Sequence, residues 1–203
     1  MITEFGHFAL VLALCVVCVQ AVLPLAGAAW GDPRLMAVAR PAAHAQLLLV
    51  ALAFAALTHA YIAGDFSVAI VAQNSHSAQP LLYRVSAVWG NHEGSLVLWV
   101  LILAAFGAAV AGFGRALPPT LAARTLAVQA MIGAGFLVFI LATSNPFARA
   151  FPPPAEGQSL NPLLQDPGLA LHPPLLYGGY VGLSIVFSFA VAALLEGRID
   201  AAW

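Results

Sequence analysis

The sequence predicts an all-α fold, a polytopic bundle of about five transmembrane helices, and two observations carry this prediction. Of the 203 residues, 62% are hydrophobic and only 7% are charged, whereas a soluble domain carries about 25% charged residues. A chain this poor in charge cannot cover its surface against water, so lipid has to solvate it. The second observation is a series of long apolar segments. The net charge is −1, so nothing in the composition suggests a nucleic acid or another polyanion as a partner.

Five apolar segments approach or exceed the length of about 20 residues that a bilayer-spanning helix needs. They cover residues 7–29, 43–63, 95–113, 125–144 and 175–195. The first ends in Ala26-Gly27-Ala28, which resembles a signal-peptide cleavage site, but its leading residues carry Glu4 and no positive charge. We therefore expect a retained helix, and a single transmembrane domain over residues 1–203.

The arginines predict the orientation, because basic residues favour the cytoplasmic side of a membrane. Two short connections and the C-terminal tail hold Arg34, Arg40, Arg115, Arg124 and Arg198. The longer connections, 64–94 and 145–174, hold one arginine each. We therefore predict that the N-terminus lies outside, that the C-terminus lies inside, and that the two long connections are outer loops.

Histidines gather on the same predicted outer side. Five of the six lie in the long connections or near outer helix ends: His7, His59, His76, His92 and His172. A membrane interface tolerates single histidines, which accounts for His7, His44 and His59 individually. It accounts less well for two long loops that both carry histidine, since loops above about 12–15 residues are usually functional or disordered. Their mixture of Trp, Pro and small polar residues favours a folded outer surface.

The stretch "VWGNHEGSLVLW", residues 88–99, combines aromatic and polar side chains where the third helix begins. Ser95 is a plausible N-cap, and Glu93 would lie near the positive end of the helix dipole. The pair His92-Glu93 suggests a zinc protease, but that motif needs a second histidine three residues after the glutamate, and position 96 is leucine. Interfacial capping and a functional polar cluster with Trp89 both remain possible interpretations.

The stretch "CVVC", Cys15 to Cys18, lies inside the first apolar segment. A redox-active pair needs an accessible thiolate, and a bilayer interior strongly disfavours one. We therefore interpret both cysteines as small apolar residues.

The stretch "QDPGLALHPPLLYGGY", residues 165–180, places a histidine next to two prolines at the edge of the fifth apolar segment. Asp166-Pro167-Gly168 is typical of a turn, and Pro173 disfavours the α conformation for His172. We therefore expect an extended His172 just before the fifth helix, with its ring in the outer space. It is either a ligand or proton relay, or a solvent-facing histidine that marks a helix start.

Four motifs together resemble the N-terminal part of CcmF-type cytochrome c biogenesis proteins, the CcmF/NrfE haem lyase family. They are "WGNHEGSLVLW", "TSNPF" (143–147), "LNPLLQDPGL" (160–169) and "HPPLLYGGYVG" (172–182), in the family's order and spacing. The stretch "GDFSVAIVAQNS" (64–75) extends the resemblance over essentially the whole chain.

The resemblance implies a protein of the bacterial inner membrane that helps to attach haem to apocytochrome c at the periplasmic face. It implies a transiently bound b-type haem, a CcmE-type haem chaperone and a CcmH-type apocytochrome-binding subunit as partners. His172 would be an axial ligand of the haem iron. The expected supporting residues are Trp89, His92, Glu93, Asp166, Pro173 and Pro174.

The family's chain continues for several spans beyond "EGRIDAAW", and its second periplasmic ligand and tryptophan-rich WWD segment lie there. We therefore expect one half of a split protein, with a separate C-terminal half, or a truncated product, and no haem lyase activity from this chain alone. Two other functions stay open from the residues. One is a transporter subunit with a histidine proton relay, which the absence of Asp, Glu and Arg at the helix midplanes disfavours. The other is a non-catalytic scaffold.

Overall fold

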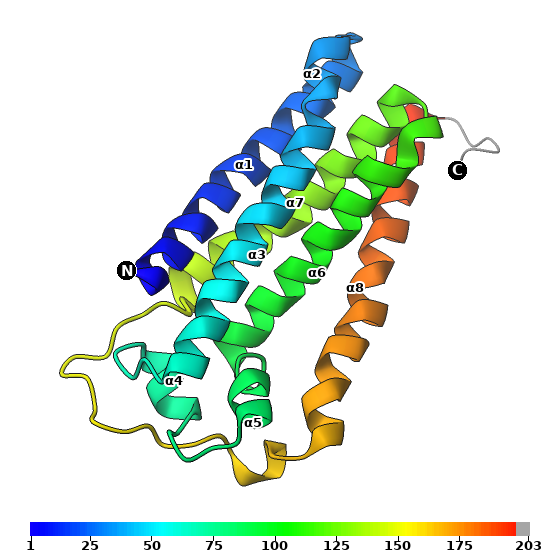
Figure 1. The fold of residues 1–203 in the computed structure, drawn as a ribbon. Coiled ribbons are helices and arrows are strands. Elements are labelled where there is room, and N and C mark those ends of the chain that lie inside the picture. The colour runs from blue at the N-terminus through cyan, green and yellow to red at the C-terminus, as the bar shows by residue number, and fades with distance from the viewer. Residues whose placement is uncertain (198–203) are drawn as a thin grey trace.

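The computed structural model describes residues 1–197, and five long helices dominate it (Figure 1). They are α1 (Ile2–Trp30), α3 (Ala39–Ala63), α6 (His92–Phe113), α7 (Pro119–Thr143) and α8 (Pro167–Glu196). All five are long and apolar enough to cross a membrane. The only β-type pairing among the described residues is the isolated bridge between Val68 and Arg149. The predicted all-α membrane bundle and its five spans are thus confirmed.

The helices pack around α7, which contacts all four other long helices, and α3 packs between α1 and α6. Fully buried side chains such as Leu10, Leu57 and Leu137 fill the space between them. Helix α8 lies at the edge of the bundle, where α6 and α7 are its main neighbours (Figure 1). Only 22% of its most apolar stretch is buried, against 39–50% in the other spans. A broad face of α8 therefore has no neighbour among residues 1–197.

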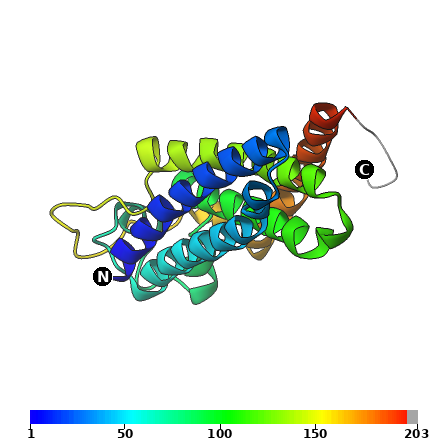
Figure 2. The ribbon, with the colours of Figure 1, turned by 90° about the horizontal axis from the view of Figure 1, so that it is seen from above.

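The two long connections form a folded layer at one end of the bundle, beside the N-terminus (Figures 1 and 2). We call residues 64–91 and 144–166 the loop layer. The first part contains the short helices α4 (Ala69–Asn74) and α5 (Leu81–Ser86), and the second contains the 3-10 turn η2 (Pro162–Leu164). Backbone hydrogen bonds join the two parts, from Ala69 N–H to the Ala148 carbonyl (2.8 Å) and from Gln158 N–H to the Ala72 carbonyl (2.8 Å).

The opposite end of the bundle is formed by α2 (Pro33–Ala37), the 3-10 helix η1 (Gly114–Ala116) and the last turns of α8. Four of the six described arginines lie at this end. Because the spans number five, the N-terminus and the end of α8 lie at opposite ends of the bundle (Figure 1).

Helix α6 begins earlier than predicted, and its cap is Asn91 rather than Ser95. The Asn91 Oδ1 atom accepts a hydrogen bond from the Gly94 N–H at 2.8 Å, which is the standard N-cap arrangement. Gly94 permits this tight turn because a Cβ there would lie 1.6 Å from the Val88 carbonyl oxygen. Ser95 instead donates its hydroxyl to the His92 carbonyl. The close neighbour of Gly94 is thus the backbone of the same chain, six residues earlier.

Helix α8 also begins earlier, so two predictions about its start are wrong. Asp166 is not part of a free turn but the N-cap, since its Oδ1 accepts from the Leu169 N–H at 3.1 Å, and Pro167 occupies the first helical position. His172 is consequently helical and not extended. The preference against an α conformation before proline is only a bias, and here capping and packing of α8 override it.

Candidate functional site

The candidate site is the surface where the loop layer meets the first turns of α8. Trp89, which follows α5, donates its indole N–H to the Ala170 carbonyl of α8 at 2.9 Å. The same ring stacks on Phe54 of α3, with ring centroids 6.4 Å apart and planes at 14°. Trp89 thus connects three elements at this end of the bundle.

The partner of Trp89 is a carbonyl that the helix itself cannot satisfy. In a regular α-helix the Ala170 carbonyl accepts from the N–H of residue 174, but Pro174 has no N–H. The Trp89 indole supplies the missing donor. Pro174 thus removes one hydrogen bond from α8, and Trp89 of the loop layer replaces it. This contact fixes the turn that carries His172.

His172 itself presents an unengaged imidazole. Its side chain is exposed and makes no hydrogen bond, ion pair or ring contact within residues 1–197. It shares the open face of α8 with Leu175 and Leu176, which are 76% and 44% exposed, and the same stripe continues one turn further to Gly179. A ring with both nitrogens available, set on an apolar surface, has the donor chemistry of a haem-iron ligand.

A small pocket lies behind this surface, with a volume of about 140 Å³. Trp89, Gly90, Leu160 and Pro173 contribute to its lining. Binding sites for small molecules usually measure about 300–1,000 Å³, so this pocket is too small for a porphyrin. A haem ligated by His172 would therefore lie on the open face of α8 and not inside the loop layer.

His92 and Glu93 belong to a different part of this end. The His92 Nε2 atom lies 3.0 Å from the Ser144 hydroxyl, and its ring meets the edge of Phe139 at 6.2 Å, so the side chain turns toward α7. Glu93 lies half-buried in the first turn of α6. No described contact joins this pair to His172. The structure brings Trp89 and Pro173 together beside His172, while His92 lies at the α6–α7 junction.

An aromatic group below His172 was not anticipated from the sequence. The Tyr177 ring of α8 lies 5.3 Å from Trp99 of α6, and Trp99 lies 5.7 Å from Phe136 of α7 (centroid distances). These three rings join the helices that carry the candidate site. The signal was present, since Trp99 and Tyr177 belong to two of the resembling motifs, but their pairing depends on packing between distant segments.

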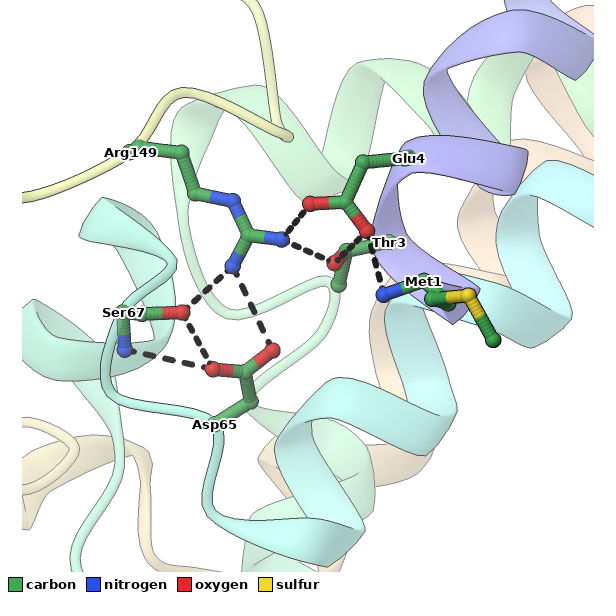
Figure 3. Close-up of polar contacts among 6 residues, drawn as sticks. All are labelled: Met1, Thr3, Glu4, Asp65, Ser67 and Arg149. Atoms are coloured by element: carbon green, nitrogen blue, oxygen red, sulfur yellow. Dashed lines mark hydrogen bonds and ion pairs between the residues drawn. The ribbon is translucent and has the colours of Figure 1, made fainter.

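Arg149 holds the loop layer to the first helix (Figure 3). Its guanidinium bonds to Glu4 and Thr3 of α1 and, on the other side, to Ser67 and to Asp65 at 3.4 Å. Elsewhere in the layer, the hydroxyl and N–H of Ser77 bond to Glu156 and hold the pKa of that carboxyl at about 2, below its ordinary 4.5. The layer is thus a charged, cross-linked surface.

Metal ligands do not cluster in this surface. Among residues 1–197, no group of three or more His, Cys, Asp or Glu side chains is placed to hold a metal ion. Cys15 and Cys18 are exposed on the face of α1 that points away from the bundle. Small apolar residues of a membrane span can occupy such positions. His172 is the only histidine among the residues of α8, and it lies on the open face of that helix.

Comparison with known proteins identifies the family. A family model described as "Cytochrome C assembly protein" matches residues 89–200, more than half of the chain. The chain belongs to this family. The matched segment contains Trp89, His92, Glu93, Asp166 and His172, so every candidate site residue lies within it.

Individual relatives agree with the family. Over all 203 residues the chain is 66% identical to the cytochrome c-type biogenesis protein ccl1 of Rhodobacter capsulatus and 63% identical to CycK of Rhizobium meliloti. A solved structure named cytochrome c haem lyase CcmF matches the whole chain with a TM-score of 0.87 at 30% identity. The chain spans about a third of the length of these proteins, 31%, 30% and 32% respectively.

Proposed function

We propose that this chain is part of a cytochrome c maturation haem lyase, and that His172 holds haem at the periplasmic face of the bacterial inner membrane. The observation that carries the proposal is the exposed, unpartnered imidazole of His172 on an apolar helix face. Family membership supports it, because the relatives are named for cytochrome c biogenesis and one for haem lyase activity.

Haem is the substrate in this proposal, transiently bound as a b-type haem. Thioether formation adds a cysteine thiol of apocytochrome c across a haem vinyl group, so the sulfur bonds one vinyl carbon and the hydrogen goes to the other. Such an addition depends on holding both reactants in register. A neutral imidazole at His172 binds one side of the iron, and the exposed leucines of α8 contact the porphyrin edge.

The neighbouring residues would position His172 and not touch the substrate. Trp89 and Pro174 fix the turn through the Ala170 carbonyl, Asp166 caps the helix, and Pro173 packs against the loop layer. His92 and Glu93 would support the same surface from the α6–α7 side.

The open face of α8 also suggests how the site becomes complete. A haem iron takes a second axial ligand, and α8 offers no second histidine on this face within residues 1–197. We propose that further polypeptide, either a continuation or a separate C-terminal half, docks on α8 and supplies it. A CcmE-type haem chaperone and a CcmH-type apocytochrome-binding subunit would then deliver haem and apocytochrome c to the same surface.

Substitution of His172 tests the proposal in the assembled maturation system. His172→Ala should lower the yield of holocytochrome c strongly, and added imidazole should restore part of it by replacing the missing ligand. The matched control is His59→Ala, which removes another exposed histidine at the same end of the bundle, on α3. Wild-type yield from His172→Ala without imidazole would overturn the ligand role.

A non-catalytic scaffold is the second candidate, and the glycines of α8 favour it. A Cβ added at Gly178 or Gly179 would meet no atom within 4 Å, so another helix can approach closely there. Purification from native membranes with a haem spectrum separates the two. Copurifying subunits without haem absorbance indicate a scaffold, whereas haem absorbance that His172→Ala removes indicates a ligand. The alternative of a transporter subunit with a histidine proton relay is disfavoured, since no His, Asp, Glu or Arg side chain of residues 1–197 is buried.

A further inference from the structure

Positive charge without compensating carboxylates gathers at the end of the bundle opposite the loop layer. Of the two described carboxylates at this end, Glu196 lies 3.9 Å from Arg124 and also accepts from Thr120. Asp32 caps α2 by accepting from the Arg34 backbone N–H at 2.8 Å. Arg40 and Arg115 therefore have no ion-pair partner within the described part of the chain.

These two arginines line one pocket. It has a volume of about 380 Å³ and lies between α2, the start of α3, η1 and the start of α7. Apart from the two guanidinium groups its side chains are apolar, and they include Met36, Leu117 and Leu126. The pocket thus combines concentrated positive charge with an apolar wall at the end of five membrane spans.

Arg40 is already oriented for binding an anion. Its Nη2 atom donates to the Gly114 carbonyl at 3.0 Å, which ties α3 to η1. An arginine has five N–H donors, and no other described acceptor contacts this guanidinium. Arg115 has no described hydrogen-bond partner and is exposed. Guanidinium groups match the geometry of phosphate oxygens, which they bind with paired hydrogen bonds.

An apolar groove continues from this pocket along the membrane-spanning part of the bundle. It has a volume of about 440 Å³, lies between α6 and α8, and is lined by residues that include Phe106, Val110 and Ile185. Leu117 lines both the groove and the arginine pocket. An anionic group at the arginines can therefore carry a hydrocarbon chain that lies in the groove.

We propose that the Arg40–Arg115 pocket binds the phosphodiester headgroup of an anionic phospholipid, with an acyl chain in the α6–α8 groove. Basic pockets between transmembrane helices are typical sites for acidic lipid headgroups. A soluble phosphate has the same negative charge as the headgroup but no hydrocarbon chain to fill the adjoining apolar groove. The charge of the pocket and the shape of the groove together therefore favour a lipid. The site is separate from His172, since it lies at the other end of the bundle.

The test uses the protein purified from its native membrane, with any subunits it carries, in nanodiscs of phosphatidylcholine. Spin-labelled phosphatidylglycerol is compared with spin-labelled phosphatidylcholine, and the immobilised fraction measures the preference. Each arginine should contribute about a fivefold preference for the anionic lipid. Arg115→Gln should lower the preference for the anionic lipid about fivefold. The double variant Arg40→Gln and Arg115→Gln should show almost no preference.

Arg34→Gln is the matched control, because Arg34 lies at the same end but does not line the pocket, and it should keep the wild-type preference. Arg40 also bonds to η1, so its substitution could disturb the fold as well as the binding of lipid. Arg115→Gln therefore decides the test, and its helical content and elution volume show whether the variant is folded. An unchanged preference in Arg115→Gln would overturn the proposal. Displacement of the labelled phosphatidylglycerol by millimolar glycerol phosphate would identify a soluble phosphate site instead, whereas no displacement supports the lipid.

Discussion

A single hydrogen bond, from Trp89 to the Ala170 carbonyl, decides how His172 is presented. Sequence reasoning expected the prolines to hold His172 in an extended conformation. The structure shows a helix in which the carbonyl left open by Pro174 is satisfied from another element. The exposure of His172 was predictable from its position beside the long loop. The role of Trp89 was not, because that contact joins residues 81 positions apart in the chain.

Removing the indole donor should loosen the first turns of α8. Trp89→Phe keeps the aromatic ring but leaves the Ala170 carbonyl without its donor, which costs about 1 kcal/mol. Amide hydrogen exchange over residues 168–176 should accelerate about fivefold. In a Pro174→Ala background the helix supplies its own N–H, so Trp89→Phe should have a smaller effect. Equal effects in both backgrounds would show that the carbonyl is not the point of contact.

Gly94 should be intolerant of any side chain. A Cβ there would lie 1.6 Å from the Val88 carbonyl oxygen, so Gly94→Ala must displace the turn before α6 and should cost about 1–3 kcal/mol. The matched control is Gly135→Ala in α7, where a Cβ would meet nothing within 4 Å. Thermal midpoints of the purified variants compare them, and a Gly94→Ala midpoint at or above that of Gly135→Ala would contradict the close approach.

The helices themselves were predictable, but their ends were not. Hydrophobicity located all five spans because each apolar run is long. It placed the start of the fifth near residue 175, whereas α8 begins at Pro167, since capping side chains and polar turns set the ends and carry little hydrophobic signal. The glycines of α7 and α8 differ in how closely other residues pack against them. Gly133 and Gly182 lie against Gln46 and Phe106, while Gly135, Gly178 and Gly179 face open space.

The start of α6 offers a direct test of which residue caps it. Asn91→Ala removes the acceptor for the Gly94 N–H and should destabilise the protein by about 1 kcal/mol. Asn91 also donates to the Tyr61 hydroxyl at 2.8 Å, which adds to the loss. Ser95→Ala, at the position expected from the sequence, should change stability much less. A larger loss for Ser95→Ala in the same unfolding assay would restore Ser95 as the cap.

At the scale of the whole molecule, two chemically different ends face each other across the bundle. One is the loop layer with five of the six histidines on or beside it, and the other carries four described arginines (Figure 1). Among the described residues, only Arg124 of these four has a carboxylate ion-pair partner for its side chain. Basic residues favour the cytoplasmic side, so this asymmetry predicts that the loop layer and His172 face the periplasm.

Thiol labelling in intact cells tests this orientation. Ala78→Cys in the loop layer and Ala37→Cys in α2 both introduce thiols at exposed positions. A membrane-impermeant maleimide should label Ala78→Cys directly and Ala37→Cys only after permeabilisation. The wild-type chain is the control, because Cys15 and Cys18 lie within a membrane span and should not react. The reverse labelling pattern would invert the topology and remove the periplasmic role of His172.

The Arg149 junction has a consequence for how the chain is made (Figure 3). Glu4 and Asp65 leave the ribosome long before Arg149, which follows them by 145 and 84 residues. Until the fourth span has been inserted, these two carboxylates have no common cation, and the polar junction between the first helix and the loop layer is not formed. Closure of the loop layer is thereby postponed to a late step of membrane insertion. Helix α8, which is made after its neighbours α6 and α7, then meets a surface that is already assembled.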